Sequence, residues 1–370
     1  MFSRSFAALI LALSFFGSIA AAQSVLTTSA GQVRLEIMAE GLDTPWAVAP
    51  LPEGGALVTE RGGRLVLARD GRLDPVAGVP RVRASGQGGL LDITLARDFA
   101  QSRRLYLTYA RRQPGGGAGT SVAVARLSPD NRRLEQVRTI FEAAPVSKGG
   151  RHFGSRVVEA ADGTLFVTLG DRGEGATAQD RSNHNGSVIR IRPDGSVPAD
   201  NPFVGQQGVR PEIWSWGHRN PQGAGLDGQG QLWISEHGAK GGDEINLIRK
   251  GTNYGWPVIS YGVEYSGKKI GEGTHKTGME QPRFYWDPSI APSGLLVYSG
   301  KLWPRWRGHI LVGSLKFDHI ARLSGAPLRA AEQIKSAETE RVRDIVEAPD
   351  GTIWFISEGR GTVYRMHPAS

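Results

Sequence analysis

The chain has 370 residues, 39% of them hydrophobic and 50 of them glycine, so it can bury a core, and a disordered protein is excluded. It contains no cysteine, which excludes disulfides, thiolate catalysis and cysteine-bound metals. The net charge of +8 suggests an anionic partner, but the basic residues are scattered and form no arm, and we expect no nucleic acid partner.

The N-terminus has the pattern of a secretory signal peptide. Arg4 supplies a positive charge, residues 7–19 form an apolar stretch, and residues 20–22 are three alanines typical of a cleavage site. We therefore expect a signal peptide over residues 1–22, a periplasmic protein and a single domain over residues 23–370. Beyond residue 22 no apolar run reaches the roughly 18 residues of a spanning helix, so we expect no membrane span.

Short apolar or alternating runs recur along the rest of the chain, each bounded by Gly, Pro, Asp or Asn. Such runs predict antiparallel strands. A unit of apolar strand, acidic-glycine turn and second apolar strand repeats six times, in residues 46–60, 90–128, 157–170, 223–236, 292–324 and 344–358. Long loops are expected at 172–185, 198–211 and 261–281.

Six repeats of this kind predict an all-β fold, a six-bladed β-propeller with a central channel. A β-sandwich or a parallel β-solenoid is the alternative, although the even spacing of the turns in the second half argues against a sandwich. In a propeller the connecting loops meet at one end of the channel. Polar residues far apart in sequence can therefore form one site.

The first candidate catalytic residue is His152, which lies in a glycine-rich loop just before a predicted strand. This position suits a general base at the channel mouth, although a histidine there can also simply bond loop backbone. Asp171 follows the strand predicted at 165–169 and can orient an imidazole or a ligand. A lone aspartate in a turn can also have a purely structural role, such as bonding the turn backbone.

A set of cationic residues lies at strand ends. Arg219 offers a fork for a carboxylate, and the neighbouring Asn220 both donates and accepts hydrogen bonds. Lys316, Arg341 and Arg343 lie at comparable places in later repeats. Each alone can be a surface charge, but together they can bind an anion with several carboxylates.

Acidic and glycine-rich segments at 235–246 and 253–257 suit a hard cation, Ca²⁺ first, although no EF-hand spacing is present. The sequence has no Gly-x-Gly-x-x-Gly after a strand and no P-loop, which disfavours nicotinamide and ATP chemistry. The nucleophile-elbow motif of hydrolases is also missing.

Seven segments in collinear order resemble the periplasmic quinoprotein sugar dehydrogenases, the soluble aldose and glucose dehydrogenases that use pyrroloquinoline quinone (PQQ). The segments are Gly86–Leu90, Gly150–Ser155, Gly170–Asp171, Gly217–Gly223, Asp243–Ile248 with Asn253–Pro257, Ser314–Lys316 and Arg341–Asp344. The resemblance runs over nearly the whole chain after residue 22. It implies a six-bladed propeller, which the repeats predict separately.

The resemblance also implies a reaction, the Ca²⁺-assisted oxidation of an aldose at C1 to the lactone, with an external electron acceptor. By resemblance, His152 is the general base, hydride passes to the quinone C5, and Asp171 is the acidic partner of the base. Cofactor contacts are implied for Gln87, Arg219, Asn220, Lys316, Arg341 and Arg343. Carbonyls of Gly238 and Ala239 match the ligands of the cofactor Ca²⁺, and Glu244 and Tyr254 match a second Ca²⁺ site.

Two residues depart from the glucose-specific branch of that family. Arg151 precedes the histidine where that branch tends to have aspartate, and Ala239 stands where it has proline. The chain is also shorter than that branch, which places it nearer the broad-specificity aldose branch and favours a monomer. Two other functions stay open: a non-catalytic propeller that binds carbohydrate or protein, and a Ca²⁺-dependent hydrolase of the lactonase type.

Overall fold

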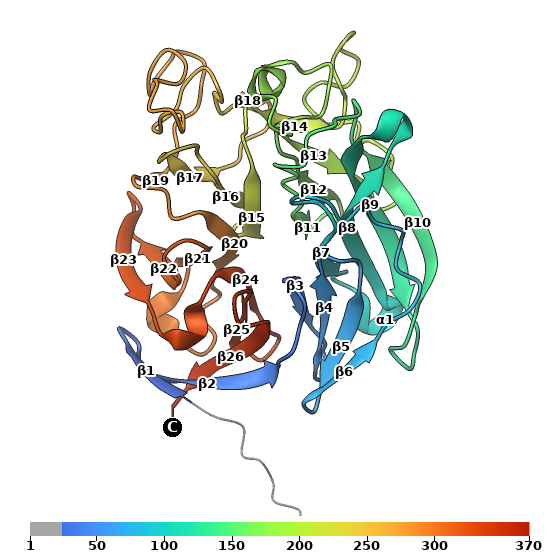
Figure 1. Cartoon of the computed structure of the whole chain (residues 1–370), viewed down its shortest axis with the longest axis vertical. Coiled ribbons are helices and arrows are strands. Elements are labelled where there is room, and N and C mark those ends of the chain that lie inside the picture. Colours follow the sequence, from blue (N-terminus) through green and yellow to red (C-terminus); the bar gives the residue numbers. More distant parts are fainter. Residues whose placement is uncertain (1–23, 370) are drawn as a thin grey trace, which may run out of the picture.

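The computed structural model describes residues 24–369, so the expected signal peptide lies outside the described residues. Six β-sheets radiate from a common centre in this part of the chain (Figure 1). Consecutive strands pair antiparallel within each sheet, which is how the blades of a propeller are built. The predicted six-bladed β-propeller is confirmed, and the alternatives of a sandwich and a solenoid are wrong.

The first three blades run outward from the centre in chain order. Blade 1 consists of β3 (Pro45–Pro50), β4 (Ala56–Glu60), β5 (Leu65–Arg69) and β6 (Arg72–Pro75). Blade 2 consists of β7 (Leu90–Leu95), β8 (Arg104–Arg112), β9 (Ala118–Leu127) and β10 (Leu134–Glu142), with the short helix α1 (Phe99–Ser102) between β7 and β8. Blade 3 consists of β11 (Val157–Glu159), β12 (Leu165–Thr168), β13 (Ser187–Ile191) and β14 (Ile213–Trp216), with the two-residue β18 (Thr252–Asn253) parallel to β14.

The next two blades repeat this order. Blade 4 consists of β15 (Pro221–Leu226), β16 (Leu232–Glu236), β17 (Asp243–Leu247) and β19 (Phe284–Trp286). Blade 5 consists of β20 (Pro292–Val297), β21 (Ile310–Ser314), β22 (His319–Ser324) and β23 (Arg329–Ile334). Single 3₁₀ turns lie in the connections at Pro114–Gly116, Gly175–Gln179, Pro304–Trp306 and Ala337–Thr339.

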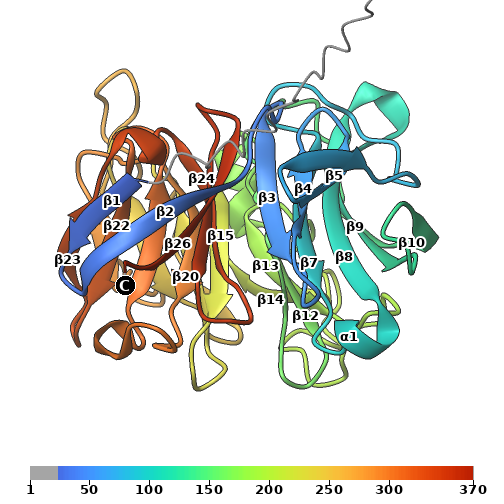
Figure 2. The same cartoon turned by 90° about the horizontal axis from the view of Figure 1, so that it is seen from below.

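Blade 6 closes the ring with strands from both ends of the described chain. It consists of β24 (Val342–Glu347), β25 (Ile353–Ser357), β26 (Thr362–Pro368), β2 (Gly31–Ala39) and β1 (Ser24–Thr28). The register of β2 on β26 places Val33 opposite Pro368. Figure 2 shows β2 lying along β26 at the edge of this blade.

The acidic-glycine turns predicted from the repeats form the connections between first and second strands. In blade 3, Gly163 has a φ of +78°, and the Asp162 carboxylate accepts the backbone N–H of Thr164 at 3.0 Å. In blade 6, Gly351 has a φ of +87°, and Thr352 donates in the same way to Asp350 at 3.0 Å. Glycine supplies the left-handed conformation and aspartate fixes the next residue, which explains the repeated pair.

The core lies between neighbouring blades. Sheets are covered on both faces, so strands such as β4 and β25 are buried at every position. Large side chains, among them Trp46, Leu91 and Tyr109, pack blade 1 against blade 2. Such two-sided packing makes the ring a rigid frame for the loops at its ends. The part of the chain that the structure describes contains no helix long and apolar enough to cross a membrane.

The first strand of every blade lies nearest the centre, where β3, β7, β11, β15, β20 and β24 form an inner ring (Figure 1). Residues from β7, β11, β15, β20 and β24 together line one cavity of the central channel. The opposite end of the channel is lined by residues at or before the beginnings of these strands. The candidate residues gather at that second end.

Candidate active site

The candidate residues occupy two kinds of position in the blades. One kind comes before the first strand, as Gln87 does before β7 and His152 before β11, and the other follows the second strand, as Asp171 does after β12. Because these two strands are antiparallel, both positions fall at the same end of the ring. Four other candidates obey the same rule: Arg219 and Asn220 before β15, Arg341 before β24, and Lys316 after β21.

His152 and Asp171 form a buried hydrogen-bonded pair. Nδ1 of His152 lies 2.6 Å from Oδ1 of Asp171, and the two side chains are 10% and 2% exposed. The other carboxylate oxygen accepts the indole N–H of Trp256 at 2.8 Å, and the backbone N–H of Gly173 donates to Oδ1 at 2.6 Å. These contacts place the imidazole proton on Nδ1 and leave Nε2 without a partner among residues 24–369.

The electrostatics of the pair favour a neutral imidazole. Burial lowers the pKa of His152 below its ordinary value and the Arg219 charge adds to this, while the hydrogen bond with Asp171 opposes it. Burial acts to raise the pKa of Asp171, but hydrogen bonds, first from His152, outweigh it and lower that pKa. At pH 7 a carboxylate therefore holds a neutral imidazole, the state that a general base needs.

The loop around His152 is held by close packing. His152 itself has a φ of +55°, in the left-handed region that is uncommon for a non-glycine residue. Its backbone N–H donates to Oε1 of Gln87 at 2.7 Å. The buried guanidinium of Arg172 donates to the carbonyls of Gly149 and Arg151. These bonds fix the position of the imidazole before any ligand binds.

A cationic cavity of about 200 Å³ lies on the Gln87 side of this loop. Its lining residues are Thr44, Trp46, Arg61, Gln87, Gln222, His237, Leu315, Arg341, Arg343 and Glu358. The Nε–H of Arg343 donates to Oε2 of Glu358 at 2.6 Å, and Nη2 of Arg341 lies 3.6 Å from Oε1. Two guanidinium groups thus share one carboxylate, and Arg61 adds a third positive charge to the lining, which leaves an excess of positive charge for an anionic ligand.

A second, smaller cavity meets the first at His237, which lines both. Arg219 lines it as well, with its guanidinium 5.3 Å from the centre of the Trp256 ring. Burial, together with the charges of Arg219 and Arg343, lowers the pKa of His237 to about 3, so this imidazole is neutral. Two buried atoms, Nε of Arg219 and Nε2 of His237, have no hydrogen-bond partner among the described residues.

These observations test whether PQQ fits the site. Its three carboxylates need several cationic donors, and Arg61, Arg341, Arg343 and Arg219 supply them around two connected cavities. An unpaired buried N–H costs free energy, so the Nε–H of Arg219 calls for an acceptor that the protein does not provide. The donor set therefore fits a polyanionic cofactor.

A carboxylate-rich spot at the wall of the smaller cavity fits a cation. Burial, with the Glu236 charge beside it, raises the pKa of Glu244 to about 8. Asn246 donates to Oε2 of Glu244 at 2.9 Å, while its own Oδ1 is buried without a partner among the described residues. The same amide nitrogen, Nδ2, also donates to Oε1 of Glu236 at 2.8 Å, so Oδ1 of Asn246 is turned away from the two carboxylates. The carboxylate oxygens of Glu236 and Glu244 are therefore the hard ligands here, of the kind that Ca²⁺ prefers.

Backbone oxygens add to this set. Gly238 packs so closely against the carbonyls of Gly241 and Gly242 that a Cβ on it would collide with both oxygens. The hydroxyl of Tyr254 donates to the carbonyl of Leu247 at 2.6 Å and accepts the backbone N–H of Arg249 at 2.9 Å, which leaves the backbone oxygen of Tyr254 for a cation contact. Residues 24–369 contain no group of three or more His, Asp and Glu side chains placed for a metal.

Five predicted site residues line neither cavity. Two of them are His152 and Asp171, which lie behind the larger cavity, where the backbone of His152 bonds the lining residue Gln87. Lys316 is exposed, and the preceding Leu315 faces the larger cavity instead. Asn220 is buried, and its Oδ1 accepts the backbone N–H of Gly154 at 3.1 Å, which supports the His152 loop. Ala239 is buried next to Gly238 but is not part of the cavity wall.

Several lining residues were not predicted from the sequence. Arg61, His237 and Glu358 directly follow the second strands β4, β16 and β25, the side on which Asp171 and Lys316 also lie. Trp46 and Gln222 are the second residues of the first strands β3 and β15, the position that Arg343 has in β24. A register-by-register alignment of the repeats is the signal that finds them.

Comparison with known proteins gives a consistent result. Residues 42–365 match the model of the glucose/sorbosone dehydrogenase family. The chain is 42% identical over 354 residues to the aldose sugar dehydrogenase YliI of Escherichia coli strain K12, an alignment that covers 93% of this chain and 95% of that protein.

Two solved structures share the fold. The apo form of the soluble aldose sugar dehydrogenase from Escherichia coli superposes with a TM-score of 0.86 and 42% identity, over 90% of this chain and 98% of that one. The PQQ-bound aldose sugar dehydrogenase from Streptomyces coelicolor superposes with a TM-score of 0.74 and 27% identity, over 94% of this chain and 98% of that one.

Proposed function

The chain belongs to the glucose/sorbosone dehydrogenase family, and from this premise we propose that it oxidises the C1 hydroxyl of an aldose to the lactone, with His152 as general base and Ca²⁺-bound PQQ as hydride acceptor. It is an enzyme of the PQQ-dependent aldose sugar dehydrogenase type, a quinoprotein. The finer assignments rest on the arrangement of its residues. The observation that carries them is the His152–Asp171 pair next to a cationic cavity with unpaired buried donors.

His152 moves the proton in this mechanism. Its unpartnered Nε2 accepts the proton of the C1 hydroxyl, while Nδ1–H stays bonded to Oδ1 of Asp171. The imidazole becomes positively charged in this step, and the Asp171 carboxylate stabilises that charge. Trp256 and Gly173 hold the carboxylate so that it does not rotate away. The proton then leaves His152 to solvent.

The cationic cavity binds and orients the cofactor. Arg61, Arg341 and Arg343 would hold its carboxylates, together with Arg219 from the adjoining smaller cavity. PQQ bound with Ca²⁺ would supply a polarised two-electron acceptor, to be reoxidised by an external electron acceptor.

Two cation positions follow from the oxygen-rich segments. The carbonyls of Gly238 and Ala239 hold the Ca²⁺ that belongs to the cofactor. Glu244 and the carbonyl of Tyr254 hold a second ion, for which the raised pKa of Glu244 provides the reason: a cation stabilises the buried charged carboxylate. The N-terminal segment supports export to the periplasm.

The test is a reconstitution experiment on the chain from Gln23 onward. Metal is stripped, PQQ is added with and without Ca²⁺, and dye reduction is followed over a panel of aldoses. We expect turnover only with both additions. Lactone hydrolysis without PQQ, or no PQQ binding at all, would contradict the proposal.

A variant pair tests the base. His152→Asn should lower kcat by about 10²- to 10⁴-fold while the Kd for PQQ stays unchanged. His184 is the matched control, because it is also buried and paired with a carboxylate, its Nε2 lying 3.4 Å from Oε2 of Glu212. Unlike His152, which bonds the lining residue Gln87, His184 bonds no residue that lines either cavity. His184→Asn should keep kcat near the wild-type value. Equal kcat in the two variants would remove His152 from its role.

A further inference from the structure

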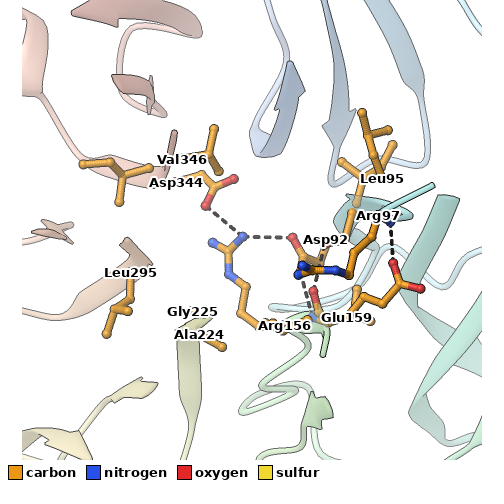
Figure 3. Close-up of a pocket in the computed structure, with 15 residues that line it drawn as sticks. Asp92, Leu95, Arg97, Arg156, Glu159, Ala224, Gly225, Leu295, Asp344 and Val346 are labelled. Atoms are coloured by element: carbon orange, nitrogen blue, oxygen red, sulfur yellow. Dashed lines mark hydrogen bonds and ion pairs between the residues drawn. The ribbon is translucent and has the colours of Figure 1, made fainter. Parts of the chain in front are cut away.

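One buried arginine that the proposed mechanism does not use, Arg156, lies in the centre of the ring. It is only 5% exposed and directly precedes β11. On one side it helps to line the channel cavity of about 200 Å³ whose walls come from the inner strands. Figure 3 shows its guanidinium between Asp92 of β7 and Asp344 of β24. It therefore connects strands on different sides of the channel.

The two aspartates fix the guanidinium from the channel side. Nη1 of Arg156 lies 2.9 Å from Oδ1 of Asp92 and 2.8 Å from Oδ1 of Asp344. The remaining oxygens of the two aspartates are also bonded, since Asp92 accepts the backbone N–H of Val157 at 2.8 Å and Asp344 accepts that of Val48 at 3.0 Å. The cluster thus ties blades 1, 2, 3 and 6 together.

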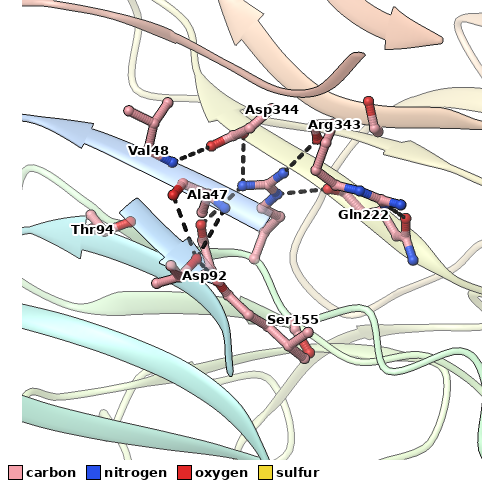
Figure 4. Close-up of polar contacts among 12 residues, drawn as sticks. Ala47, Val48, Asp92, Thr94, Ser155, Gln222, Arg343 and Asp344 are labelled. Atoms are coloured by element: carbon pink, nitrogen blue, oxygen red, sulfur yellow. Dashed lines mark hydrogen bonds and ion pairs between the residues drawn. The ribbon is translucent and has the colours of Figure 1, made fainter. Parts of the chain in front are cut away.

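The same guanidinium reaches the cofactor side. Its Nε–H donates to the carbonyl of Gln222 at 2.6 Å, and Nη2 donates to the carbonyl of Arg343 at 3.3 Å. Its flat face lies 4.3 Å from the centre of the Trp46 ring. Gln222, Arg343 and Trp46 all line the cationic cavity. Figure 4 shows Gln222 and Arg343 on one side of this cluster and Asp92 on the other.

These contacts affect the positions of Arg343 and Gln222 in the wall of the cationic cavity. The side chains of Arg343 and Gln222 bond to each other, Nη1 to Oε1 at 3.0 Å, so a shift of either backbone moves both groups. The planar fork of arginine can bond two carboxylates and two carbonyls at once, whereas the ammonium of lysine cannot reach all four. Arg156 lines the channel cavity but not the cationic cavity, so it supports the lining residues Trp46, Gln222 and Arg343 from behind.

We propose that Arg156 is a positioning residue for the cofactor: it supports the wall of the cationic cavity from behind and sets the orientation of Arg343 and Gln222. The inference rests on the proposed function, because the cofactor in question is PQQ. Arg156 touches neither sugar nor base in this arrangement. It acts on PQQ affinity through the backbone of its neighbours.

The test compares Arg156→Lys with Arg190→Lys. Arg190 is a matched control: it is 7% exposed, it bonds Asp162 at 2.7 Å and Asp200 at 2.9 Å, and it lies 5.0 Å from the centre of the Trp214 ring. None of these partners lines either cavity, whereas the partners Gln222, Arg343 and Trp46 of Arg156 line the cationic one. The Kd for PQQ is measured by equilibrium dialysis in Ca²⁺ buffer, together with the Tm of each variant. We expect Arg156→Lys to raise this Kd at least about tenfold and Arg190→Lys to leave it within about twofold.

The kinetic readout separates positioning from simple loss of stability. At saturating PQQ, Arg156→Lys should recover a kcat and a sugar KM close to the wild-type values. A purely structural role would lower Tm without changing the Kd, and that result overturns the inference. If the wild-type chain itself binds no PQQ, the proposed function fails; if it binds and Arg156→Lys binds equally well, only the inference fails.

A second variant keeps the test valid if Arg156→Lys does not fold. The triple variant Asp92→Asn, Arg156→Met, Asp344→Asn removes all three charges while keeping similar shapes, which buried ion clusters often tolerate. We expect it to fold and to bind PQQ at least about tenfold more weakly. A folded triple variant with the wild-type Kd overturns the inference.

Discussion

Two arginine clusters in this protein have nearly the same composition and very different surroundings. Arg156 and Arg190 are each buried, each stacked on a tryptophan and each bonded to two aspartates. The aspartate side chains around Arg156 are 6% and 3% exposed, whereas those around Arg190 are 52% and 65% exposed. The cluster around Arg156 is therefore shielded from solvent, whereas the cluster around Arg190 has the same residue types with its two carboxylates exposed to solvent.

The pKa values of the aspartates shift in opposite directions in the two clusters. Burial raises the pKa of Asp344 to about 6 even though Arg156 opposes the shift, and Asp92 adds to it. At Asp162 burial also acts upward, but hydrogen bonds from Thr164 and Arg190 outweigh it and lower the pKa to about 2. A buried ion cluster is costly to assemble, so the channel cluster is better explained by the geometry it fixes than by stability.

The largest effect is expected at another buried pair, His152 with Asp171. If buried charges here are kept for function, Asp171→Asn should reduce kcat by about 10²- to 10⁴-fold, because the imidazole loses its tautomer and its charge partner. Removing a hydrogen bond that raises the His152 pKa should also move the acid limb of the pH–rate profile to lower pH. Wild-type activity falls as pH drops through the lowered His152 pKa. An unchanged acid limb would show that another group titrates.

The next effect is on stability. Arg156→Ala leaves two buried carboxylates unpaired and should lower the free energy of unfolding by about 3–5 kcal/mol. Arg190→Ala returns two exposed carboxylates to water and should cost about 1–2 kcal/mol, mainly through lost packing on Trp214. Urea unfolding of both variants measures the difference. Equal losses would break the distinction between the two clusters.

The pH dependence of stability separates the clusters by sign. The folded-state pKa of Asp344 lies above its unfolded value, so the free energy of unfolding falls as pH rises from about 4 to about 6. The slope is at most about 1.4 kcal/mol per pH unit, and Asp344→Asn should remove it. The folded-state pKa of Asp162 is lowered, so its contribution is present above about pH 4 and is lost as pH falls toward 2. Slopes of the same sign in the two asparagine variants would contradict this.

Salt should have the smallest effect. Raising NaCl from about 0.05 M to about 0.5 M screens the exposed Arg190 cluster and should reduce the stability cost of Arg190→Ala by about 0.3 kcal/mol. The cost of Arg156→Ala should not change, because the channel cluster excludes ions. Thermal unfolding at the two salt concentrations checks both statements. A larger salt effect at Arg156 would mean that solvent reaches the channel centre.

The sequence predicts the fold because the propeller signal is local and repeated. Asp162–Gly163 and Asp350–Gly351 each show a complete turn within a few residues. His152 and Asp171 were also found from the sequence, because the loops that hold them are recognisable as motifs. The family resemblance implied that Asp171 is the acidic partner of His152, but the local pattern alone did not, since their 2.6 Å contact depends on how two loops of blade 3 pack.

Other parts of the site depend on geometry that local sequence does not contain. Lys316 was expected in the cationic cluster, but in the turn after β21 it is Leu315 that faces the cavity. Arg156 looks like an ordinary strand entry in the sequence. Its partners lie 64 residues earlier, at Asp92, and 187 residues later, at Arg343, so only the closed ring reveals its role.

The pairing of β2 with β26 also has a consequence for how the protein is made. Val33 leaves the ribosome long before its strand partner Pro368 is made. Blades 1 to 5 contain no strand from beyond β23 and can form as they emerge, whereas blade 6 must wait. The ring then closes in one late step, and the growing chain has no complete cofactor cavity before it, because Arg341, Arg343 and Glu358 arrive with that blade.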